Sequence, residues 1–172
     1  MSYEWLKSES GPKILVEAVK LLGTKESVGN ANNPLILEWS KKLGLQKVYT
    51  NDAIPWCGLF IGYVVKMAGK DVVKNPLYAL NWATWGNPID KPELGDILTF
   101  KRDGGGHVGI YVGEDNDFYH VLGGNQGDAV TVSRIAKTRL YRARRTQWSI
   151  AQPKNVRRVF LEAKGEITTN EK

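Results

Sequence analysis

The spacing of apolar residues changes near Pro92, and this change limits the folds open to the chain. Before Pro92, apolar residues recur at intervals of three and four, which is the period of an α-helix. After Pro92, apolar and polar residues alternate in short segments separated by Gly- and Asp-rich loops, as in antiparallel strands. Helices followed by strands predict an α+β fold, with N-terminal helices packed on a C-terminal antiparallel β-sheet.

The boundaries of the expected elements follow from helix caps, helix stops and turn residues. A Pro or an Asn-Pro pair opens each helix and a Gly closes it, which predicts helices over 12–22, 33–44, 55–69 and 75–86. The alternating segments predict strands over 97–100, 107–112, 118–122, 130–133 and 140–143. We expect one domain over residues 1–147 and a loosely attached polar and basic tail over 148–172, in which 156–161 could add an edge strand.

Composition excludes several classes of protein. The 172 residues include one Cys and two His, which rules out an internal disulfide and argues against a structural zinc cluster. No run of about 18 apolar residues is present to span a membrane, and the first residues lack the pattern of a secretory signal. We therefore expect a soluble protein synthesised in the cytoplasm without a signal peptide, and no metal or other cofactor.

The net charge of +6 is concentrated near the C-terminus. Residues 129–161 include nine basic residues and no acidic ones, so the rest of the chain has a net charge of −3. Such a segment is either a solvated surface or an attachment site for a polyanion. The residues that we expect to contact an anionic wall or membrane surface are Arg134, Arg139, Arg142, Arg144 and Arg145.

Cys57 is the candidate nucleophile. It lies two residues after Pro55, in the first turn of the most regular predicted helix. Backbone N–H groups in a first turn have no helical partner, and together with the helix dipole they favour the thiolate. The same groups can receive the oxyanion that forms when a carbonyl is attacked. From its position alone, Cys57 could equally be a small buried apolar residue.

His107 is the candidate base. It follows a Gly-rich loop over 103–106 and begins a predicted strand, so a flexible loop could admit substrate while a rigid strand holds the ring. Cys–His catalysis requires an imidazole that accepts the thiol proton and returns it to the leaving amine, and a third polar group that fixes the tautomer. A lone His at a strand edge is otherwise usually a surface residue.

Three segments in this order resemble a known family. They are Pro55-Trp-Cys-Gly-x-Phe60, Leu94-Gly-Asp-Ile-Leu98 and Gly106-His-Val-Gly-Ile-Tyr-Val-Gly113. Together they resemble the papain-like cysteine peptidases of the NlpC and CHAP types, which degrade bacterial peptidoglycan. A small bacterial and phage group of such proteins is similar also at 21–26, 33–39 and 121–126. The resemblance covers residues 12–140 and implies a papain-like fold, with Cys57 as nucleophile and His107 as base.

The family leaves two choices for the third catalytic residue. NlpC-type enzymes place a second His about a dozen residues after the first, which selects His120, whereas CHAP-type enzymes place a Glu or Asn later, which selects Asn125. With a tight turn at 115–116, the position that faces His107 across the hairpin lies near residue 124, which favours Asn125. Parity favours His120, because Asn125 shares a sheet face with His107 only if 123–124 forms a bulge.

Four further residues are candidates for substrate contacts. Asp52, five residues before Cys57, could cap the helix or bind a substrate amine. Trp56 and Trp82 could offer their faces to a sugar or peptide, although tryptophans at helical spacing are more often part of the core. Gln126 could form a hydrogen bond near the site, and nothing in the sequence fixes its place.

The leading hypothesis is a hydrolase that cleaves an amide bond in the peptide portion of bacterial peptidoglycan, as an endopeptidase or an N-acetylmuramoyl-L-alanine amidase. We expect a monomer that acts at the cell wall after release or export, as a phage endolysin or an exported antibacterial effector. The alternative is a non-catalytic module that binds nucleic acid or an anionic wall polymer through the basic segment over 129–161, with affinity that falls steeply with salt. Under the leading hypothesis we expect no specific nucleic acid as a partner. Only the first hypothesis predicts that Cys57→Ala abolishes activity.

Overall fold

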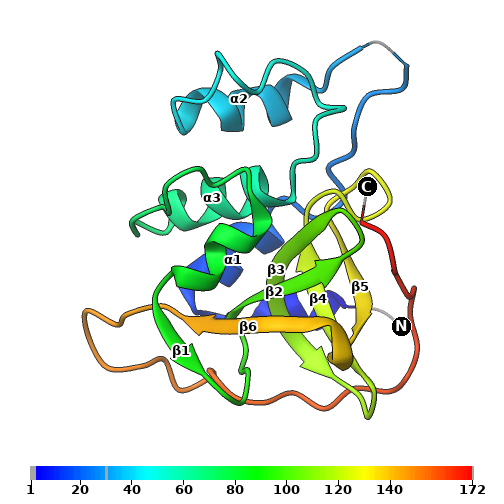
Figure 1. Ribbon diagram of the computed structural model, residues 1–172. Helices are drawn as coiled ribbons and strands as arrows, with labels where there is room; N and C mark the ends of the chain where they lie inside the picture. The colour runs from blue at the N-terminus through cyan, green and yellow to red at the C-terminus, as the bar shows by residue number, and fades with distance from the viewer. Residues whose placement is uncertain (1–2, 30, 172) are drawn as a thin grey trace.

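Helices occupy the first part of the chain and strands the second, in a computed structural model that describes residues 3–29 and 31–171 (Figure 1). The helices in this part are η1 (Glu4–Ser8), α1 (Lys13–Val19), α2 (Pro34–Lys42), α3 (Cys57–Met67), η2 (Ala79–Thr84) and η3 (Lys137–Arg139), where η marks a 3-10 helix. The strands are β1 (Asn87–Ile89), β2 (Ile97–Arg102), β3 (Gly105–Glu114), β4 (Phe118–Gly123), β5 (Thr131–Ala136) and β6 (Leu140–Arg145). The predicted α+β class is confirmed.

The described strands form one antiparallel sheet in the order β1-β6-β2-β3-β4-β5. Strands β2 to β5 follow one another as the alternating pattern predicts. Strand β6 then returns to the free edge of β2, and the sheet curls (Figure 1). The sequence did not indicate β1, because this strand has three residues and a central Pro.

The predicted helix starts are right to within two residues for α1, α2 and α3, and the fourth predicted helix is wrong. Asn33 caps α2 by accepting a hydrogen bond from the Leu35 N–H at 2.8 Å. The segment predicted as a helix over 75–86 contains only η2. Asn75 has a φ of 50°, and the Pro76 carbonyl accepts from the indole N–H of Trp82 at 3.0 Å instead of supporting a helical turn.

Apolar side chains pack on both faces of the sheet. On one face, α3 contributes Leu59 and Phe60 to a core that also includes Val108 and Ile110 of β3. The opposite face carries a second cluster: Leu98, Phe100, Tyr111, Tyr119, Val121, Ile135 and Ala143. Within residues 3–29 and 31–171, every helix is too short or too polar to cross a bilayer.

The C-terminal segment is tied to the sheet, so the expectation of a loosely attached tail is wrong. The backbone N–H of Leu94 donates to Arg157, that of Glu114 to Val159, and that of Arg134 to Glu166, at 2.8, 2.8 and 2.7 Å. No strand forms over 156–161, where the β-type pairing recorded is an isolated parallel bridge between Glu114 and Phe160. In Figure 1 this segment runs along the outside of the sheet and ends near the tip of the β4–β5 region.

Candidate functional site

Cys57 is the first residue of α3, and the start of this helix has no side-chain cap. The first intrahelical hydrogen bond runs from the Phe60 N–H to the Trp56 carbonyl at 2.9 Å, so the preceding N–H groups are not used by the helix. Gly58 allows the chain to approach this turn closely, because a Cβ there would overlap the carbonyl oxygen of Pro76. The local structure therefore places a thiol beside free backbone donors, as the sequence predicts.

The thiol of Cys57 is buried, with 5% of the residue exposed. Burial raises the pKa of Cys57, while hydrogen bonds from the backbone N–H groups of Val108 and Gly58 act in the opposite direction and are weaker. The expected preference for the thiolate is thus not met, because desolvation outweighs the hydrogen bonds from the Val108 and Gly58 N–H groups. The sulfur is a neutral thiol held between α3 and β3.

Gln126 orients the imidazole of His107. His107 lies in β3 and is fully buried, and its Nε2 is 3.0 Å from Oε1 of Gln126. The amide nitrogen of Gln126 donates to the carbonyls of Val121 at 3.1 Å and Thr131 at 2.8 Å, so the amide oxygen faces the ring. Since that oxygen can only accept, Nε2 carries the ring proton and Nδ1 is the basic nitrogen.

Among the described residues, one ring nitrogen of His107 has no hydrogen-bond partner and can accept a proton. Nδ1 is buried and has no hydrogen-bond partner in the described part of the chain. Burial lowers the pKa of His107 to about 4, against the charge of Glu171, which acts to raise it. The ring is therefore neutral at physiological pH, in the protonation state that a general base requires.

Cys57 and His107 are neighbours through the backbone of β3. The Val108 N–H that faces the sulfur belongs to the peptide unit that joins Val108 to His107. No hydrogen bond connects the thiol to the ring among residues 3–29 and 31–171. Catalytic hydrogen bonds are often long or poorly aligned before substrate binds. The thiol of Cys57 and the ring of His107 are thus both neutral, and the peptide unit between His107 and Val108 links them.

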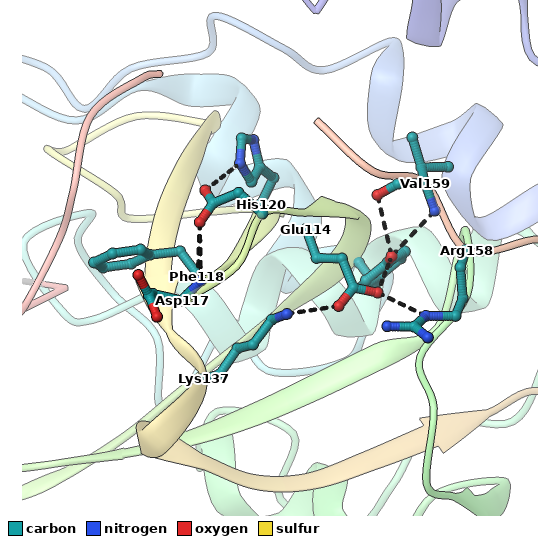
Figure 2. Close-up of polar contacts among 9 residues, drawn as sticks. Glu114, Asp117, Phe118, His120, Lys137, Arg158 and Val159 are labelled. Carbon is teal, nitrogen blue, oxygen red and sulfur yellow. Dashed lines mark hydrogen bonds and ion pairs between the residues drawn. The ribbon is translucent and has the colours of Figure 1, made fainter. Parts of the chain in front are cut away.

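His120 is not the partner of His107, contrary to one of the two expectations. Its Nε2 is 2.9 Å from Oδ2 of Asp115, and its Nδ1 is 2.8 Å from the hydroxyl of Tyr3 (Figure 2 shows the contact to Asp115). A register shift between Tyr111 and Gly113 places His120 opposite Gly113. Because of this bulge, His120 and His107 lie on opposite faces of the sheet.

Asn125 is close in sequence to the observed partner and does not contact the ring. It is 3% exposed, has a φ of 58°, and its Oδ1 has no hydrogen-bond partner among the described residues. The bulge at 123–124 that Asn125 would need to share a face with His107 is not recorded, and the register shift lies at 111–113 instead. The neighbouring Gln126, expected only as a substrate contact, takes the orienting position. The sequence signal was that two amide residues, Asn125 and Gln126, are adjacent. The strand register determines which of the two contacts His107.

The other predicted substrate residues have mixed outcomes. Trp56 and Trp82 are fully buried, so neither presents a ring face to a groove. The carboxylate of Asp52 accepts hydrogen bonds from the backbone N–H groups of Ser27 at 3.0 Å and Asn33 at 2.8 Å. It therefore does not cap α3 but, with 3% of the residue exposed, links the loop after α1 to the start of α2, and its contact to a substrate amine stays a prediction.

Most arginines of the basic segment have partners inside the protein. Arg134 bonds to Asp115, Arg139 to Glu171, and Arg145 to Asp96 and Glu93, all at 2.7 to 2.9 Å. Arg144 donates to the backbone carbonyls of Trp85 and Gly86. Arg142 is exposed and pairs with no carboxylate among the described residues. Much of the expected anionic-surface patch is thus used in internal contacts.

Neither protein-family models nor curated proteins gave a match to this sequence. In the described part of the chain, no three His, Cys, Asp or Glu side chains converge in a way that could hold a metal ion. A surface pocket of about 530 Å³, lined by residues that include Lys70, Trp85 and Trp148, lies beyond the C-terminal end of α3 and does not include Cys57.

Proposed function

We propose that this protein is a papain-like cysteine hydrolase that cleaves an amide bond in the peptide portion of bacterial peptidoglycan. The observation that carries the proposal is the fixed tautomer of His107, whose free Nδ1 belongs to the residue next to the backbone donor of the Cys57 sulfur. A nucleophile at a helix start, a base on the adjoining strand and an amide that orients the base are the parts required for acyl transfer. The sequence resemblance supplies the substrate class.

The chain's own residues account for each step. Nδ1 of His107 takes the Sγ proton of Cys57 as the sulfur attacks the amide carbonyl, and unpaired N–H groups of the first turn of α3 receive the oxyanion. The imidazolium then gives the proton to the leaving amine, and the C–N bond breaks. Water attacks the resulting thioester with His107 as base, which releases the carboxylic acid and restores the thiol.

The neutral state of both groups determines how this reaction starts. Burial raises the pKa of Cys57 and lowers that of His107. A preformed thiolate–imidazolium pair is therefore disfavoured, and proton transfer accompanies the attack on the substrate. The hydrogen bond from His107 Nε2 to Gln126 stabilises the imidazolium as it forms.

The proposal includes a context for the enzyme. Endopeptidase and N-acetylmuramoyl-L-alanine amidase activities break different amides through the same residues. We propose a monomer that needs no cofactor and acts at the cell wall after release or export, as a phage endolysin or an exported antibacterial effector. The binding-module alternative relies on the basic segment, and internal partners of Arg134, Arg139 and Arg145 leave it fewer free charges.

The test compares wild-type protein with Cys57→Ala on purified cell walls. We expect wild-type protein to reduce wall turbidity and Cys57→Ala to have no effect, with identical circular dichroism spectra for the two proteins. Mass spectrometry of the released fragments identifies the new termini and so separates the endopeptidase from the amidase. Equal release of fragments by the two proteins, or release by neither from walls of several peptide chemistries, would reject the proposal.

A further inference from the structure

The two proposed catalytic residues are closed to a peptide substrate. Cys57 is 5% exposed and His107 is fully buried. The attack on an amide requires the carbonyl carbon of a peptide to reach the sulfur, so part of the protein has to move first. Helix α3 and strand β3, which carry the two residues, pack against each other in the main core. A segment at the surface is therefore the part that can open the site.

The segment over 166–171 crosses the sheet and is held to it by polar contacts (Figure 1). The backbone N–H of Arg134 donates to the Glu166 carbonyl at 2.7 Å, and the N–H of Thr168 donates to the Arg134 carbonyl at 3.1 Å. Nη1 of Arg102 donates to Oδ1 of Asn170 at 3.3 Å. Residues 166, 167, 169 and 170 are exposed, so most of this segment lies on the surface.

Glu171 is the buried residue of this exposed segment. It is 1% exposed, and its two carboxylate oxygens accept hydrogen bonds from Nη1 and Nη2 of Arg139 at 2.9 and 2.8 Å. Although burial acts to raise it, the hydrogen bonds from Arg139 lower the pKa of Glu171, so the side chain is ionised at neutral pH. Burial of a carboxylate is costly, and a bidentate guanidinium offsets this cost. The pair with Arg139 therefore fastens the segment.

The arginines that hold the segment are anchored on the backbone next to His107. Nε of Arg102 donates to the carbonyl of Gly106, the residue before His107, at 3.3 Å. Nε of Arg139 donates to the carbonyl of Lys101 at 3.1 Å, and Lys101 lies opposite Gly106 where β2 pairs with β3. The segment is thus fastened where the strand that carries the base begins.

The charge of Glu171 acts on both reacting groups. Burial raises the pKa of Cys57 and lowers that of His107 to about 4, and among the charged side chains Glu171 raises both values while Arg102 lowers both. Coulomb effects weaken with distance, so Glu171 lies near the sulfur and near the ring. The electrostatics and the hydrogen bonds therefore place the same end of the segment beside the catalytic pair.

On the basis of the proposed function, we propose that residues 166–171 form an autoinhibitory strap, which closes the site while Glu171 is bound to Arg139 and opens it when this pair separates. Separation moves the carboxylate into water and uncovers Cys57. The closed state dominates because opening breaks two charge-assisted hydrogen bonds. Substrate binds only the open molecules, so the strap lowers the apparent affinity by the open fraction.

The test measures access to Cys57, which is the only cysteine in the sequence. Wild-type protein and variants are treated with iodoacetamide, and mass spectrometry follows the modification with time. Glu171→Gln cannot form the charge-assisted pair, so we expect modification about 10- to 100-fold faster than in wild-type protein. Modification at the wild-type rate or slower would overturn the strap.

Arg139→Gln separates access from a direct effect of charge on the thiol. Removal of Glu171 also removes a negative charge that raises the pKa of Cys57, and this alone would favour the reactive thiolate. Arg139→Gln removes a positive charge instead, and it unfastens the same strap. We therefore expect faster modification in both variants, with circular dichroism spectra that match wild-type protein. Faster modification in Glu171→Gln alone would reject the strap.

Glu162→Gln is the matched control. Glu162 is an exposed carboxylate shortly before the strap, and it pairs with Lys164 at the surface. Its replacement removes the same charge from the same stretch of chain and leaves the pair of Glu171 and Arg139 intact. We expect modification of Cys57 at the wild-type rate. Equal acceleration in Glu162→Gln and Glu171→Gln would overturn the inference.

Hydrolysis of a soluble stem peptide separates the strap from the proposed function. Glu171→Gln should raise kcat/KM by about the factor by which it speeds modification, mainly through KM. Faster modification without hydrolysis by any of the proteins keeps the strap and rejects the enzyme. Hydrolysis with equal modification rates keeps the enzyme and rejects the strap. Faster modification with slower hydrolysis would show that Glu171 supports the reaction, which also rejects autoinhibition.

Discussion

Acidic residues have different kinds of hydrogen-bond partner in two regions of this protein. On the side of the sheet reached by β5 and the C-terminal segment, carboxylates are enclosed by arginine and lysine side chains, and Figure 2 shows Glu114 between Lys137 and Arg158. In the loops around Cys57, the carboxylate of Asp52 accepts from backbone N–H groups and that of Glu26 from an indole N–H, while Asp128 is exposed. Removing one partner of a buried ion pair leaves an uncompensated charge, whereas the loop carboxylates around Cys57 have no basic partner to lose among the described residues.

The largest stability effect is expected at Arg134. Its Nε donates to Asp115 at 2.8 Å, and its guanidinium lies 4.5 Å from the centre of the Phe118 ring. Arg134→Met leaves Asp115 buried with its charge only partly compensated, and should lower the free energy of unfolding by about 3 kcal/mol in urea titrations. Asp128→Asn in the other region should change it by less than about 0.5 kcal/mol. Equal losses in the two variants would remove the distinction between the regions.

Apart from the reacting residues Cys57 and His107, the largest effect on catalysis is expected at Gln126. Gln126→Ala frees Nε2 of His107 and should lower kcat about 100-fold or more, with a smaller change in KM. Nitrogen chemical shifts of the His107 ring should show a mixture of tautomers in place of the single form protonated at Nε2. Asn125→Ala should keep the single tautomer and most of kcat. If Asn125→Ala instead changes the tautomer, the assignment of the orienting residue is wrong.

The sequence predicts the order of elements well and the placement of the third site residue poorly. Periodicity identifies α3 and the β2–β5 meander because each buries an apolar face. The partner of His107 depends on a bulge near Val112, which shifts pairing between β3 and β4 by one residue. A single-residue shift leaves no mark in a hydrophobic pattern, so turn geometry and parity gave conflicting answers for Asn125 and His120.

The pairing of charged residues was the other feature that the sequence predicted incompletely. The count of basic residues over 129–161 correctly locates the positive segment. It does not show that distant acids such as Glu9, Asp96 and Glu171 fold back onto it. These pairs span long stretches of chain, and no local pattern encodes them. The burial of Cys57 likewise depends on tertiary contacts, so the expected thiolate was not found.

The two regions should respond to acid in opposite directions. Although burial acts to raise it, hydrogen bonds from Arg134 and His120 lower the pKa of Asp115 from 3.8 to about 2. Its stabilising contribution is therefore present above about pH 4 and is lost as the pH falls toward 2. The pKa of Glu26 is raised by burial and by its acidic neighbours, so its ionised form destabilises the fold above that pKa, and protonation relieves this.

This contrast can be measured by thermal unfolding between pH 2 and 7. Asp115→Asn should remove part of the acid-induced loss of stability, because the residue no longer titrates. Glu26→Gln should raise stability slightly at neutral pH, by up to about 0.5 kcal/mol, and should have less effect below the pKa of Glu26. The same sign of change for both variants at every pH would contradict the comparison.

The smallest stability effect is expected where the basic segment has no internal carboxylate. The Arg142 guanidinium lies 4.7 Å from the centre of the Tyr141 ring and donates to the Tyr141 carbonyl, and Lys154 is exposed without an ion pair among the described residues. Changing both to Gln should alter the free energy of unfolding by less than about 0.5 kcal/mol. Their charge is then available for an anionic wall, so the double variant should be released from walls at lower salt while cleaving a soluble peptide at the wild-type rate.

Arg145→Gln is the opposing control, because loss of its bonds to Asp96 and Glu93 should destabilise the fold. Retention of the double variant at wild-type salt concentrations would show that the positive segment serves the fold alone.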